Sequence, residues 1–167
     1  NWRGRAGAYP RFRDHGKPGV LSRALQEWDQ FVVFCEKRIG VRPQPNRCDL
    51  TKIDHLIEGR DWTDLADLAV LLPWLESFSR FSQSDNPNLL VQFHEKREHG
   101  ELSVALSSEV GQDSARVLKI ETTVTRDVSS PPNLRDVFVS ANDEANGVFE
   151  HLIPSDQRAK RFGMGAE

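Results

Sequence analysis

The residues with the clearest chemical potential lie at the start of the sequence, in the segment NWRGRAGAYPRF. Four arginines are interleaved here or just beyond with three aromatic residues: Arg3, Arg5, Arg11 and Arg13, and Trp2, Tyr9 and Phe12. Guanidinium groups bind phosphate oxygens and aromatic rings stack on bases, so this composition suits a nucleic acid or nucleotide. The rings can equally anchor the segment on neighbouring helices and strands, and the arginines can dock a protein. All three interpretations stay open.

The second chemical candidate is His55, which follows Asp54 in the segment NRCDLTKIDHLI, residues 46–57. Thr51, Ile53, His55 and Ile57 alternate there with Lys52 and Asp54, which predicts a half-buried strand. Asp54 and His55 then point to opposite faces and cannot share a pocket without a bulge. A structural, hydrogen-bonding His55 is the main interpretation, and an enzyme with a pocket near His55 is an alternative.

Other titratable clusters lack the spacing of a reactive centre. His94, Glu95, Glu98 and His99 crowd a predicted hairpin, and His151 follows Glu150 near the end of a predicted helix. None has the helical HExxH spacing of a zinc site, and the sequence has no phosphate-binding glycine loop and no GxSxG motif. We therefore expect surface charge at these places, with no metal and no cofactor.

Composition places the chain among ordinary globular proteins. The sequence has 167 residues, of which 38% are hydrophobic and 28% charged, so one domain covering 1–167 is expected. No segment has the length and apolarity needed to cross a bilayer, which predicts no membrane partner. The net charge of -3 is uneven, because residues 1–17 carry five basic residues against one acidic residue.

The two cysteines, Cys35 and Cys48, lie outside any CxxC pattern. We expect both to be reduced and buried, which favours a cytoplasmic protein. Their spacing in the sequence does not decide whether they form a disulfide.

Periodicity predicts the elements that would position these residues. Apolar residues at three-and-four spacing predict a helix over 18–39, ending at Gly40, and one with Asp61 as its N-cap, ended or kinked near Pro73. Period-two runs predict strands over 89–95, 101–107 and 116–126. A long helix from 134 to 152 and a short one from 155 to 162 complete the chain.

This order predicts an α+β fold. Three consecutive strands without crossover helices favour a mainly antiparallel sheet, packed against two long amphipathic helices. An exposed edge of such a sheet needs cover, so a homodimer is one expectation.

Several short motifs resemble a sporadically distributed family of uncharacterised bacterial proteins. They are Asn1-Trp2-Arg3 with Tyr9-Pro10-Arg11-Phe12, the strand with Asn46, Cys48, Ile53 and His55, the element with Gly59, Trp62, Asp64 and Leu65, and the C-terminal Phe149–Ile153 and Arg161–Gly163. The resemblance implies that this chain is the C-terminal part of a longer one and lacks an N-terminal segment. It implies no catalytic residues.

The sequence therefore favours a non-enzymatic interaction module of a bacterial cytoplasmic protein that binds a protein partner. The patchy distribution of the resembled family suggests a toxin, defence or mobile-element locus. One alternative is a nucleic-acid-binding accessory protein that uses the basic N-terminal stretch, with Arg3, Arg5, Arg11, Arg13 and Tyr9 as binding residues. The other is the enzyme with a pocket near His55.

Overall fold

The protein is described here from a computed structural model, which describes residues 18–79, 88–111, 115–128 and 133–162. The chain divides into two compact units, one of residues 1–48 with 127–139 and one of residues 49–126 with 140–167. The second unit contains most of the sheet and both cavities described below.

The first unit is built on helix α1 (Val20–Ile39), close to the predicted range. Gly40 adopts a left-handed conformation with φ 67°, and its N–H donates to the Glu36 carbonyl at 3.2 Å, which confirms the expected C-cap. Cys35 and Cys48 are both buried and form no disulfide. Ile39 is 66% exposed although it continues the apolar spacing, because periodicity indicates a shared face and not how far that face is covered.

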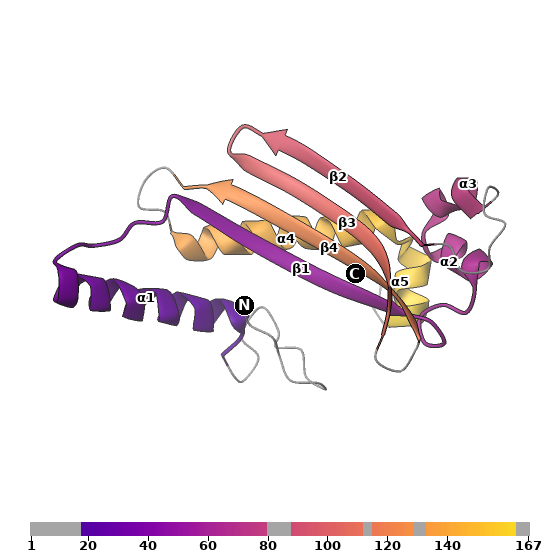
Figure 1. Cartoon of the computed structure of the whole chain (residues 1–167), viewed down its shortest axis with the longest axis horizontal. Coiled ribbons are helices and arrows are strands. Elements are labelled where there is room, and N and C mark those ends of the chain that lie inside the picture. Colours follow the sequence, from indigo (N-terminus) through magenta and orange to yellow (C-terminus); the bar gives the residue numbers. More distant parts are fainter. Residues whose placement is uncertain (1–17, 80–87, 112–114, 129–132, 163–167) are drawn as a thin grey trace. The chain divides into compact units, whose positions relative to one another are not determined.

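Four strands form one open antiparallel sheet in the order β1-β4-β3-β2 (Figure 1). They are β1 (Arg47–Ile57), β2 (Leu90–Arg97), β3 (Gly100–Val110) and β4 (Arg116–Asp127). The predicted α+β fold with an antiparallel sheet is confirmed. A two-residue turn, Glu98-His99, joins β2 to β3, so that Arg97 pairs with Gly100.

The remaining helices are α2 (Leu65–Leu71), the 3₁₀ turn η1 (Pro73–Leu75), α3 (Glu76–Ser79), α4 (Leu134–Leu152) and α5 (Ser155–Phe162). The bounds of α4 and α5 are those predicted. The predicted break at Pro73 is also confirmed. Leu72, the residue before the proline, has φ -127° and ψ 80°, because the proline ring excludes the helical conformation there.

The beginning of α2 differs from the prediction. Asp64 caps the helix by accepting the Asp67 N–H at 2.8 Å, and Asp61 does not. Asp61 is buried in the turn after β1, where its carboxylate accepts the Ile57 N–H at 2.8 Å and a bond from Arg60. Asp61-Asp64 and Asp64-Asp67 have the same three-residue spacing, so the sequence signal did not distinguish them.

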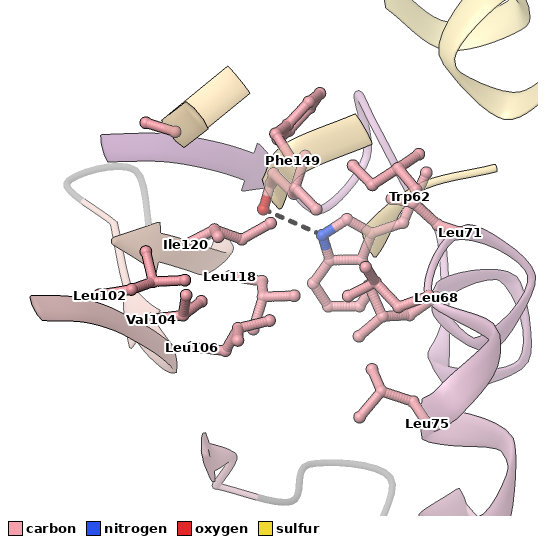
Figure 2. Close-up of a cluster of buried hydrophobic side chains, with 14 of the residues drawn as sticks. Trp62, Leu68, Leu71, Leu75, Leu102, Val104, Leu106, Leu118, Ile120 and Phe149 are labelled. Atoms are coloured by element: carbon pink, nitrogen blue, oxygen red, sulfur yellow. Dashed lines mark hydrogen bonds between the residues drawn. The ribbon is translucent and has the colours of Figure 1, made fainter. Parts of the chain in front are cut away.

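One face of the sheet, called the inner face, carries the core (Figure 2). Helices α2 and α4 supply the opposing residues, among them Leu71 and Ala145, each 0% exposed. The buried residues on β3 and β4 include Leu102, Val104, Leu106, Leu118, Ile120 and Val124. Trp62 lies within this core, and its indole N–H donates to the Leu56 carbonyl at 3.0 Å (Figure 2).

Strand β1 has the half-buried alternation that the sequence predicted. The side with Ile53 and His55 is exposed, whereas the alternate positions, including Lys52 and Asp54, are buried or half-buried. Leu56 is the anchor of that buried side, at 1% exposure. Two contacts offset the cost of partly burying these charges. The Lys52 ammonium pairs with the Asp54 carboxylate at 3.4 Å, and it lies 4.7 Å from the Phe149 ring centroid.

We predict that Gly100→Ala destabilises the protein by about 2–4 kcal/mol. Gly100 has φ 141°, and an added Cβ would lie 2.1 Å from the Thr125 carbonyl oxygen on β4. Chemical denaturation measures the loss. Gly147→Ala, in α4, is the matched control: a Cβ there meets nothing within 4 Å, and stability should rise by up to about 1 kcal/mol. Equal effects at the two positions would contradict the prediction.

Candidate functional site

The candidate site is an apolar groove of about 680 Å³ between the inner face of β2 and β3 and helix α4. Trp74 of η1 contributes to its wall. The lining residues are Trp74, Val91, Phe93, Arg97, Leu102, Val104, Leu106, Glu144, Gly147, Val148, His151 and Leu152. This volume lies within the range of about 300–1,000 Å³ that is typical of ligand sites.

The groove exists because, among the described residues, the helical layer covers β3 but not β2. Leu102, Val104 and Leu106 on the inner face of β3 are each at most 6% exposed. Phe93, which pairs with Val104, is 52% exposed on the same face. Gly147 widens the gap, because it offers no side chain from α4 and an added Cβ would meet nothing within 4 Å.

An ion-pair network forms the polar end of the groove. The Glu144 carboxylate on α4 pairs with both Arg97 at the end of β2 and Arg126 at the end of β4. Arg97 also donates two bonds to Glu95, at 3.0 and 3.1 Å. Burial, and then repulsion from Arg97, lower the pKa of Arg126. The four charges compensate one another, so this network fixes α4 to the strand ends.

The lining is mostly apolar, and its only titratable side chains are Arg97, Glu144 and His151. It contains no Ser, Thr, Cys or Lys that could act as a nucleophile. The carboxylate of Glu144 is already engaged by two guanidinium groups. The Nδ1 atom of His151 lies 2.7 Å from the Gly147 carbonyl oxygen of its own helix.

A second cavity, of about 700 Å³, lies between the start of α2 and α5 and is polar. Its walls are formed by Arg60, Thr63, Asp64, Ala66, Asp67, Val70, Lys160 and Arg161. Arg161 donates to Asp67 and also, at 2.6 Å, to the Asp61 carbonyl. The bonds from Arg161 to the Asp67 carboxylate, assisted by the bond from the Thr63 N–H, lower the pKa of Asp67 to about 2. Arg161 and Asp67 bind each other and are therefore not free for a ligand. We interpret this cavity as a junction that holds α5 against the turn after β1.

His55 takes part in neither cavity. Its side chain is exposed, and its backbone carbonyl accepts a bond from Arg60 at 3.5 Å. Asp54 points to the other face, as predicted for neighbours on a strand. Burial raises the pKa of Asp54, and the adjacent Lys52 ammonium opposes that rise.

The basic N-terminal candidates, Arg3, Arg5, Tyr9, Arg11 and Arg13, lie outside the described residues. On the hairpin, the Nε2 atom of the exposed His94 lies 4.0 Å from a carboxylate oxygen of the half-buried Glu101, and Nε2 of His99 lies 3.8 Å from a carboxylate oxygen of Glu98, both of them exposed. Within the described ranges, no three His, Cys, Asp or Glu residues are arranged to hold a metal. No helix in these ranges is long and apolar enough to span a membrane.

Sequence reasoning did not find the groove. Its walls are ordinary strand and helix residues, and periodicity assigns such residues to a core. The one local signal was Gly147, in the middle of an amphipathic helix where glycine costs about 1 kcal/mol relative to alanine. Comparison of the chain with family models, curated proteins and solved structures finds no match in any of the three.

The Asp67–Arg161 pair predicts a specific pH dependence of stability. The folded-state pKa of Asp67, about 2, lies below its usual 3.8, so the stabilisation is present above pH 4 and is lost as the pH falls towards 2. Asp67→Asn should therefore cost about 1 kcal/mol at pH 7 and almost nothing near pH 2. Denaturant unfolding of both proteins from pH 7 to pH 2 measures the difference.

The control is Glu98→Gln, which removes a carboxylate that is 89% exposed on the hairpin turn. It should leave the stability of the protein nearly unchanged at every pH. A cost of Asp67→Asn that stays constant down to pH 2 would contradict the assignment.

Proposed function

We propose that the protein is a non-enzymatic interaction module that binds an apolar segment of a protein partner in the groove formed by β2, β3 and α4. The observation that carries the proposal is the uncovered apolar surface of this groove. Exposed apolar surface that is concave and rimmed by polar groups is typical of interaction sites.

The groove favours a protein segment because its wall is long and mostly aliphatic. Phe93 and Val91 present their inner-face side chains along β2, and Val148 and Leu152 present theirs along α4. A row of apolar side chains from a helix or strand fits between two such rows. The ion-pair network at one end supplies the polar rim.

The groove supports binding over catalysis because its surface is mostly apolar, because the Glu144 carboxylate is already held by two guanidinium groups, and because the His151 Nδ1 atom lies 2.7 Å from the Gly147 carbonyl oxygen. The exposed His55, outside both described cavities, gives the enzyme alternative no supporting geometry. Among the described residues, no observation favours the nucleic-acid alternative.

We predict that Gly147→Trp abolishes partner binding without unfolding the protein. The new side chain would project into the groove from a position where a Cβ meets nothing within 4 Å. The full chain, immobilised, serves as bait for an extract of its source cells, and the bound proteins are identified by mass spectrometry. The same protein should bind wild type and Gly147→Ala, and at least about tenfold less of it should bind Gly147→Trp.

A second measurement does not need the partner. An environment-sensitive dye such as anilinonaphthalene sulfonate should fluoresce on wild type and on Gly147→Ala, and much less on Gly147→Trp. A partner that binds all three proteins equally, or no stable partner for wild type, would overturn the proposal.

A further inference from the structure

Strand β2 leaves one side of its backbone without a partner among the described residues, since β3 is its only neighbour in the sheet (Figure 1). The Ser108 N–H donates to the Leu89 carbonyl at 2.9 Å. Residues of an antiparallel pair alternate between bonding to the neighbour and pointing away from it. Leu89 bonds to β3, so the other odd-numbered residues of the strand also bond to β3. The even-numbered residues point their backbone N–H and C=O groups to the open edge; they are Leu90, Gln92, His94 and Lys96.

The side chains of β2 divide the strand into two halves. Leu90 to Phe93 are uncharged, and Leu90 and Phe93 are 68% and 52% exposed. His94 to Arg97 are charged or titratable. If a second copy of β2 paired with it in the antiparallel direction, the uncharged half of each copy would face the charged half of the other.

We propose that two copies of this chain pair through β2, antiparallel, about a two-fold axis at Phe93. This axis is the one that lets all four outward-pointing residues of each copy exchange hydrogen bonds, Leu90 with Lys96 and Gln92 with His94 of the second copy. The two sheets then form one continuous sheet. The proposal goes beyond the proposed function and does not rest on it.

The charges of the strand fit this register. Glu95 lies opposite Val91 and Lys96 lies opposite Leu90, so no like charges face each other. The aliphatic stem of Lys96 covers the exposed Leu90 while its ammonium stays in water. Moving the axis towards the hairpin would bring Glu95 against Glu95 or Lys96 against Lys96, which is unfavourable.

The axis also covers the exposed aromatic ring. Phe93 meets Phe93 of the second copy at a position without direct hydrogen bonds, where the Cα atoms of an antiparallel pair are about 4.5 Å apart. Both rings lie on the inner face, where each forms the β2 side of its own groove. The two grooves of the dimer therefore open on the same face, on either side of the paired rings.

The first test is the mass of the full chain in solution, measured by sedimentation equilibrium from about 1 to 100 μM, with a dimer expected. Gln92→Pro should produce a monomer that keeps its fold, because the lost N–H points to the open edge and not to β3. Retention of the fold is checked by circular dichroism. A wild-type protein that is monomeric over the whole range overturns the proposal.

The second test fixes the register in the native fold and does not require a proline. Phe93→Cys should form an intermolecular disulfide with oxidised glutathione, since cysteines at this axis meet the distance requirement. Val91→Cys is the matched control on the same face. It should cross-link at least about tenfold more slowly, because its counterpart in the second copy is Glu95 and two Val91 residues are far apart.

Cys35 and Cys48 are buried and are the same in both variants. Equal cross-linking of Phe93→Cys and Val91→Cys would overturn the register, even if a dimer is found. Gly147→Trp, which fills the groove, should leave the dimer intact. Failure of partner binding and failure of dimerisation are therefore separate results.

Discussion

The structure of the larger unit depends on covering one face of an antiparallel sheet. Ile120 and Val124 on β4 have no exposed surface, and they stay buried only while helices lie over them. Burying apolar surface contributes about 25 cal/mol per Å², so no single polar contact competes with this layer. Ala141 and Ala145 present small side chains from α4 to the sheet, which allows the close approach of the helix.

Polar contacts at the two ends of the sheet determine where the helices lie on it. At one end, Glu58 binds Arg116 at 2.6 Å, and Arg161 holds α5 through Asp67 and the Asp61 carbonyl. At the other end, Glu144 fixes α4 between Arg97 and Arg126. Partly exposed pairs of this kind contribute little stability each. Their effect is positional, since they fix the line along which α4 crosses the strands.

The position of α4 on the sheet explains both the groove and the open edge of β2. In the described part of the chain, α4 covers the strands up to β3 and leaves the inner face of β2 without a helix. Gly59, Trp62 and Asp64 have structural roles in the turn after β1 and at the start of α2. Gly59 supplies a positive φ of 81°, Trp62 fills the core and Asp64 caps α2. None of these residues lines the apolar groove.

The sequence by itself determined the elements and the fold class. The limits of α4 and α5, the break at Pro73, the cap at Gly40 and the three-stranded meander all follow from local rules of periodicity and backbone conformation. Tertiary structure alone decided which face of β1 is turned to the core, because the partners of the half-buried Lys52–Asp54 pair include Phe149, which comes from a distant helix. It also decided that Asp64 and not Asp61 caps α2, and that the helices stop at β3. These outcomes depend on contacts between segments that are far apart in the sequence. The spacing of residues within one segment does not show which other segments will pack against it.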